Sequence, residues 1–135
     1  MQLYQAAFSL PVGDPRRTHT FYTRVFGGDR VHLDDNTVSV DLPGASVFFI
    51  EREEFNLLLK PALVEADFAT EKFTSMLSAT VGTRDEAYAC LKAAVDGGGS
   101  ACGQAVHYPW GMASYFKDPD GHLWEIIWRD GKFRV

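Results

Sequence analysis

The stretch YFKDPDGHLWEIIW, residues 115–128, has the pattern of two β-strands joined by a tight turn. Its centre, DPDG, has proline second and glycine fourth, which fits a type I turn followed by a left-handed residue. Because side chains alternate along a strand, the second strand places Trp124 and Ile126 on one face and Glu125 on the other. Glu125 therefore lies either on an ordinary solvent-exposed sheet face or on the wall of a cavity.

A pattern of strand, helix and three further strands occurs twice in the chain. Val81 follows Val12 by 69 positions in the two first strands, and Gly97 follows Gly27 by 70 positions at the two helix ends. A match across two kinds of element indicates an internal repeat. We therefore predict an α+β fold built from two tandem βαβββ modules. The predicted parts are a single domain at 1–135, a first module at 1–52, a connecting arm at 53–72 and a second module at 73–135.

The strand patterns predict that each module has a hollow side. In the first strand of each module, one face is apolar, as a helix-covered face must be. The other face carries small or polar residues, such as Ser9 in the first module and Ser78 in the second. If both modules curve their mixed sheets alike, these faces line a cavity and Glu125 points into it.

The composition argues against several classes of protein and partner. The 135 residues carry a formal net charge of -5 and no long run of lysine or arginine, so we expect neither nucleic acid nor an anionic membrane as a partner. No apolar stretch approaches the roughly 20 residues that span a bilayer, and residues 1–14 lack the pattern of a signal peptide. Cys90 and Cys102 do not have the spacing of a zinc site, so we predict free thiols in a reducing cytoplasm.

The repeated plan, the opening LPVGDPRRTHTFYTRVFGG and the closing SYFKDPDGHLWEIIW together resemble the vicinal oxygen chelate superfamily. That superfamily includes glyoxalase I, the bleomycin resistance proteins and the extradiol dioxygenases. Within it, the chain is most similar to small bacterial proteins described as predicted lactoylglutathione lyases. The resemblance implies paired modules that each form an incomplete barrel around a cavity, often in a homodimer. It also implies one divalent metal, held by His and Glu from first and last strands, that polarises vicinal oxygens of a substrate.

The resemblance places the four family ligand positions on Ala7, Phe48, Met76 and Glu125. Alanine and phenylalanine have no donor atom, and a thioether suits soft metals. One carboxylate alone does not hold a divalent ion tightly, because protein metal sites normally use three or more protein ligands. We therefore expect a cavity without the full family metal site and leave the cofactor unknown. Glu125 is the candidate catalytic residue and the one metal-ligand position that is retained.

Other residues could alter this interpretation. A register shift or bulge could bring Glu51 toward the ligand positions, and His107 and Tyr108 could reach inward from a middle strand. We expect His19, in the middle of a helix beside Thr18, to face solvent, and His32, on a short edge-like strand, to be exposed.

Three functions fit these observations. We favour a protein that binds a small organic molecule in the cavity, as the resemblance to the bleomycin resistance branch implies, and that forms a homodimer. The alternative is a metal-dependent lyase, similar to lactoylglutathione lyase, or a dioxygenase. A second alternative is a non-catalytic dimeric interaction protein, and whether the chain is an enzyme is left open. The candidate substrate-binding residues are Ala7, Ser9, Phe48, Met76, Ser78, Tyr108, Trp110 and Tyr115.

Overall fold

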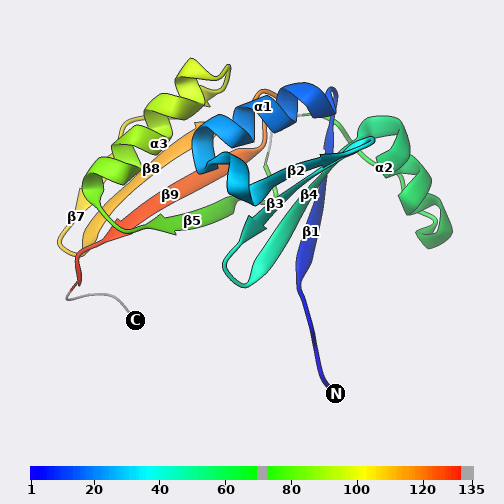
Figure 1. The fold of residues 1–135 in the computed structure, drawn as a ribbon, viewed down its shortest axis with the longest axis horizontal. Coiled ribbons are helices and arrows are strands. Elements are labelled where there is room, and N and C mark those ends of the chain that lie inside the picture. The colour runs from blue at the N-terminus through cyan, green and yellow to red at the C-terminus, as the bar shows by residue number, and fades with distance from the viewer. Residues whose placement is uncertain (70–72, 132–135) are drawn as a thin grey trace. The chain divides into compact units, whose positions relative to one another are not determined.

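A computed structural model describes residues 1–69 and 73–131 of the chain. The chain divides into two compact units, Met1–Ala69 and Thr70–Val135 (Figure 1). Each unit contains one open sheet of parallel and antiparallel strands, so the predicted α+β fold is confirmed. The module boundaries at residues 52 and 73 stay a prediction. Residues 70–72 of the predicted arm and 132–135 of the predicted second module lie outside the described residues.

In unit 1 the four strands are arranged in the order β1-β4-β3-β2, with β1 parallel to β4 and the other pairs antiparallel. Helix α1 lies across β2, β3 and β4 on one face of this sheet (Figure 1). A second helix follows the last strand. The elements are β1 (Ala7–Val12), α1 (Pro15–Phe26), η1 (Gly28–Arg30), β2 (Val31–Asp34), β3 (Thr37–Leu42), β4 (Ala45–Glu51), α2 (Arg52–Leu59) and η2 (Lys60–Ala62).

Unit 2 repeats this strand order as β5-β9-β8-β6, with β5 parallel to β9. The two-residue strand β6 was not predicted. Strands β6 and β7 pair with opposite ends of β8, so together they occupy the place that β2 has in unit 1. The elements are β5 (Leu77–Val81), α3 (Arg84–Asp96), β6 (Ser100–Ala101), β7 (Val106–Tyr108), β8 (Gly111–Lys117) and β9 (Leu123–Arg129).

Local sequence signals explain where α1 begins and ends. The Asp14 carboxylate accepts hydrogen bonds from the backbone N–H groups of Arg16 and Arg17, at 3.0 and 3.4 Å, which satisfies donors that have no partner inside the helix. Pro15 occupies the first helical turn, where its missing N–H costs nothing. Gly27 ends the helix at a φ of 92°, a conformation that glycine adopts readily.

Helices α1 and α3 each cover the apolar face of the sheet in their own unit. In unit 1 the rings of Tyr22 and Phe49 stack with their centroids 4.5 Å apart, and both side chains are fully buried. In unit 2 the buried residues of α3 are Ala87, Cys90 and Ala94, and burial raises the pKa of the Cys90 thiol to about 11. Among the described residues, no helix combines the length and apolar character needed to cross a membrane.

The hairpin between β8 and β9 has the predicted turn. Asp118 is 4% exposed, and its Oδ1 accepts hydrogen bonds from the N–H groups of Asp120 and His122, both at 2.9 Å. Gly121 follows with a φ of 90°, which favours glycine. The turn sets the register in which Tyr115 lies opposite Glu125.

Gly111 at the start of β8 is required by a close approach of the neighbouring strand. A Cβ atom built on Gly111 would lie 1.9 Å from the carbonyl oxygen of Trp128, and the φ of 152° also disfavours a side chain.

We expect Gly111→Ala to lower the free energy of unfolding by at least about 3 kcal/mol, measured by urea denaturation. Gly103→Ala is the matched control, because Gly103 also has a positive φ but no neighbouring atom within 4 Å of the Cβ that alanine would add; it should cost about 1 kcal/mol. Equal losses in the two variants would contradict the steric argument.

Candidate functional site

The carboxylate of Glu125 is held by two hydroxyl groups from the neighbouring strands. Ser78 of β5 and Tyr115 of β8 both lie directly opposite Glu125 of β9. The Ser78 hydroxyl donates to Oε1 of Glu125 at 3.0 Å, and the Tyr115 hydroxyl donates to Oε2 at 2.8 Å. Each carboxylate oxygen thus accepts one charge-assisted hydrogen bond, which fixes the orientation of the side chain.

Strand alternation explains why Glu125 lies on the face of the unit 2 sheet opposite to that of Trp124 and Ile126. Its neighbours Trp124 and Ile126 are fully buried, while Glu125 is half-buried and Ser78 is exposed. The ladder partners of Trp124 and Ile126 include Phe116 and Ser114, which are also buried. The face that carries Glu125 is therefore the more open face of the unit 2 sheet.

The hydrogen bond to Glu125 perturbs the ionisation of Tyr115. The Glu125 carboxylate accepts a hydrogen bond from the phenol, and this bond, together with partial burial and the nearby negative charge, raises the pKa of Tyr115 above its ordinary value. Tyr108 contributes in the same direction through its own charge when ionised. The phenol of Tyr115 consequently remains protonated, and remains a donor to Glu125, across the physiological pH range.

An aromatic stack lies on the same face of the sheet. Tyr108 of β7 pairs with Gly111, and Gly111 pairs with Arg129 of β9, so the side chains of Tyr108 and Arg129 share the face of Glu125. The rings of Tyr108 and Trp110 stack with centroids 4.7 Å apart and planes 7° apart, and the Arg129 guanidinium lies 5.0 Å from the Trp110 centroid. Tyr108 keeps 41% of its surface exposed, which leaves an aromatic surface available to a ligand.

In unit 1 the predicted lining residues occupy the face of the sheet away from α1. Ser9 lies opposite Phe48, and Ala7 lies opposite Ser46. Ala7 and Ser9 are exposed, whereas Phe48 is half-buried. The pair Ser9–Phe48 has the same register as Ser78–Glu125 in unit 2, because each pair lies three residues before the last partners of its parallel ladder. Phe48 therefore occupies the place in unit 1 that Glu125 occupies in unit 2.

Met76 directly precedes β5 and is 45% exposed. Its spacing to Val81 equals that of Ala7 to Val12, so Met76 takes the first-strand position of unit 2.

Two residues considered as substitutes have other partners. Oε2 of Glu51 accepts from the backbone N–H groups of Glu53 and Glu54, at 3.0 and 3.2 Å, so this carboxylate caps helix α2. His107 pairs with the buried Met112, on the helix-covered face, and its Nε2 lies 3.4 Å from the Tyr88 hydroxyl of α3. The possibility that His107 reaches the face of Glu125 is therefore wrong, because β7 places it on the opposite face.

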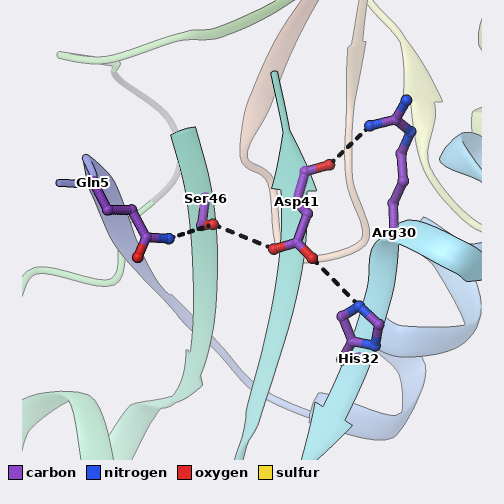
Figure 2. Close-up of polar contacts among 5 residues, drawn as sticks. All are labelled: Gln5, Arg30, His32, Asp41 and Ser46. Carbon is purple, nitrogen blue, oxygen red and sulfur yellow. Dashed lines mark hydrogen bonds and ion pairs between the residues drawn. The ribbon is translucent and has the colours of Figure 1, made fainter. Parts of the chain in front are cut away.

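The sequence did not predict a polar cluster on the face of the unit 1 sheet away from α1, called here the open face of unit 1 (Figure 2). Nε2 of Gln5 donates to Oγ of Ser46 at 2.9 Å, and Ser46 donates to Oδ1 of Asp41 at 3.2 Å. Nε2 of His32 lies 3.3 Å from Oδ2 of Asp41, and Arg30 donates to the Asp41 backbone carbonyl at 3.2 Å. His32 is 56% exposed, as expected, but its contact with Asp41 depends on strand pairing. The signal available in the sequence was the hairpin turn LPGA, which places Asp41 and Ser46 opposite each other.

Comparison with protein-family models matches residues 4–126 to the Glyoxalase/Bleomycin resistance protein/Dioxygenase superfamily. The chain belongs to this superfamily. No curated protein gave a significant match.

Several solved structures share the fold of this superfamily member. A hypothetical protein from S. aureus is 21% identical, with a TM-score of 0.77 and 94% of each chain covered. A glyoxalase-related enzyme from Fulvimarina pelagi is 24% identical, with a TM-score of 0.77, covering 96% of this chain and 89% of its own. A genomically encoded fosfomycin resistance protein from Listeria monocytogenes is 15% identical, with a TM-score of 0.68 and full coverage of both chains.

The side chains at the four positions that the resemblance predicts as ligand positions do not fit a divalent metal. Ala7 and Phe48 offer no donor atom and Met76 offers a soft thioether, so Glu125 is the one hard donor among the four. Within residues 1–69 and 73–131, no three His, Cys, Asp or Glu side chains form a group that could hold a metal ion.

The shift of Tyr115 can be tested with a single substitution. Glu125→Gln removes the charge and weakens the acceptor, so the pKa of Tyr115 should fall toward the ordinary tyrosine value near 10. The measurement is an NMR titration of ¹³C-labelled tyrosine rings, with Tyr115→Phe to assign the resonance and Glu53→Gln as a control. In the wild type, this group's contribution to stability is full below its unfolded pKa and is lost as pH rises through the raised native pKa. A Tyr115 titration that is unchanged in Glu125→Gln would show that the hydrogen bond is not its cause.

Proposed function

We propose that this superfamily member binds a small organic molecule at the face of unit 2 that carries Glu125, without a divalent metal at the family ligand positions. The observation that carries the proposal is the double hydroxyl contact of Glu125. The side chain at the retained family position is oriented by Ser78 and Tyr115, and hydroxyl groups of this kind position a carboxylate for hydrogen bonding to a ligand.

The neighbouring side chains indicate what such a ligand offers. After bonding to the two hydroxyls, each oxygen of Glu125 keeps acceptor capacity, so a ligand group with N–H donors complements it. The stack of Tyr108, Trp110 and Arg129 lies on the same face and favours a planar group with a π surface. The formal net charge of -5 favours the approach of a cation. We therefore infer a planar, donor-rich and cationic molecule.

The wider comparisons support binding as a function for this fold. The superfamily description includes bleomycin resistance proteins, and the relative from Listeria monocytogenes is described as a fosfomycin resistance protein. Both descriptions name small molecules. The proposal keeps the homodimer and the cytoplasmic location expected from the sequence; the exposed leucines of α2, Leu57 and Leu58, support a subunit contact.

Metal content separates this proposal from the metal-dependent lyase or dioxygenase. We expect the purified wild type and Glu125→Gln to contain far less than one metal ion per chain, after loading with nickel or zinc, because the ligand positions lack hard donors. Plasma mass spectrometry of manganese, iron, cobalt, nickel, copper and zinc gives the measurement. Near one metal per wild-type chain, lost in the variant, would overturn the proposal and favour the metal-dependent enzyme.

Benzamidine is a direct probe of the binding face, because it combines a planar ring with an amidinium that donates two parallel hydrogen bonds. We expect benzamidine to perturb the amide resonances of β8 and β9, and Glu125→Gln to weaken its binding by roughly tenfold. Glu53→Gln is the control for loss of one negative charge, and neutral benzamide is the control for the ring alone. Equal binding of benzamidine and benzamide, or equal binding by wild type and Glu125→Gln, would remove the role of the carboxylate.

A further inference from the structure

The open face of unit 1 carries a group of polar side chains that includes neither a predicted metal-ligand position nor Glu125. Strand pairing forms one cross-strand row through Ser9, Phe48, Ser39 and His32, which lie on β1, β4, β3 and β2 in that order. The corresponding row in unit 2 contains Ser78, Glu125 and Tyr115. Unit 1 therefore has Phe48 where unit 2 has its acid, and ends the row with His32.

One acid of unit 1, Asp41, lies in the next row along the same face. Asp41 of β3 pairs with Ser46 of β4, and Ser46 pairs with Ala7 of β1. Ser46 is 6% exposed and donates to Oδ1 of Asp41, while Gln5 donates to Ser46 (Figure 2). The amide, the hydroxyl and the carboxylate thus form a chain that ends on Asp41 and fixes its orientation.

The orientation of the Asp41 carboxylate decides which nitrogen of His32 carries the proton. Oδ1 of Asp41 accepts from Ser46, and Oδ2 faces Nε2 of His32 at 3.3 Å. An ionised carboxylate is an acceptor only, so Nε2 must be the protonated nitrogen in this contact. In the neutral imidazole, Nδ1 is then the atom with the lone pair. His32 is 56% exposed, which leaves its ring accessible to a ligand.

We propose that His32 and Asp41 form a proton-accepting dyad on the open face of unit 1, with Nδ1 of His32 as the atom that meets the ligand. Ser46 and Gln5 are positioning residues that act through Asp41. The site takes a molecule with a weakly acidic hydroxyl or thiol. This proposal does not depend on the role of Glu125.

The step that the dyad performs is a single proton transfer. Nδ1 of His32 forms an N–H bond as the O–H or S–H bond of the ligand breaks, and the electron pair of that bond stays on the ligand oxygen or sulfur. The imidazolium keeps its proton on Nε2, 3.3 Å from Oδ2 of Asp41, and the negative charge of that carboxylate stabilises it. The reverse transfer restores both partners, so no other reactant is consumed.

Asp41→Asn distinguishes the dyad from a structural contact. In this variant Oδ1 of the amide still accepts from Ser46, so its NH₂ group faces Nε2 of His32 and donates to it. We expect the proton of neutral His32 to move to Nδ1. The tautomer is read from ¹⁵N chemical shifts of the imidazole ring, with the Nε2–H form expected in the wild type and the Nδ1–H form in the variant.

Diethyl pyrocarbonate reacts with an imidazole nitrogen that carries a lone pair. Its rate of reaction with His32 therefore reports whether Nδ1 has a free lone pair. We expect His32 to be modified roughly threefold more slowly in Asp41→Asn than in the wild type, a modest factor because the pair is exposed. Ser46→Ala should have a smaller effect, since the carboxylate charge remains. Mass spectrometry of peptides gives the rate for each histidine, and His19, His107 and His122 serve as internal references.

Asp34→Asn is the matched control, because Asp34 lies on the same strand and face as His32, whereas the ion pair of His32 is formed with Asp41. An Nδ1–H tautomer in the wild type would overturn the proposal without any variant. Equal His32 rates in the wild type and Asp41→Asn, or equal slowing in Asp34→Asn, would also overturn it.

Discussion

The buried carboxylate of Asp118 closes the turn that sets the register in which β8 pairs with β9. Its Oδ1 accepts two backbone N–H groups at 2.9 Å and so closes the turn before β9. A slip of one residue would move Glu125 to the helix-covered face and expose Trp124 and Ile126. Burial of each of those side chains contributes about 2 to 3 kcal/mol, so the core opposes the slip as firmly as the turn does. The contacts of Glu125 with Ser78 and Tyr115 exist only in this register.

The sheets of the two units share one strand order and differ in the chemistry of their open faces. Phe48 and Glu125 occupy equivalent places beside equivalent serines, Ser9 and Ser78. In unit 2 the serine donates to the acid. In unit 1 the hydroxyl–carboxylate pair is formed instead by Ser46 and Asp41, one row along the sheet. The equivalent positions of the two units therefore do not both supply a metal ligand: Glu125 has a carboxylate, whereas Phe48 has no donor atom.

The elements that the sequence predicted well are those governed by local rules. The cap of α1 at Asp14, the turn at residues 118–121 and the face of Glu125 all follow from residues a few positions apart. The short strand β6 has no pattern to reveal it, because two residues show no alternation. The contact between His32 and Asp41 depends on the register of β2 against β3, which joins residues nine positions apart and is set by the packing of the whole sheet.

Hydroxyl contacts and metal ligation make different demands on a carboxylate. A divalent metal needs several hard donors that converge on one point, whereas Ser78 and Tyr115 approach Glu125 from two different strands and bond to different oxygens. The raised pKa of Tyr115 keeps its proton in place, so the phenol acts as a donor and not as an anionic ligand. Each of the two oxygens of Glu125 can then accept at least one further hydrogen bond, and both oxygens lie in the plane of the carboxylate. Two parallel N–H donors, as in an amidine or a guanidine, match that geometry better than a single cationic point.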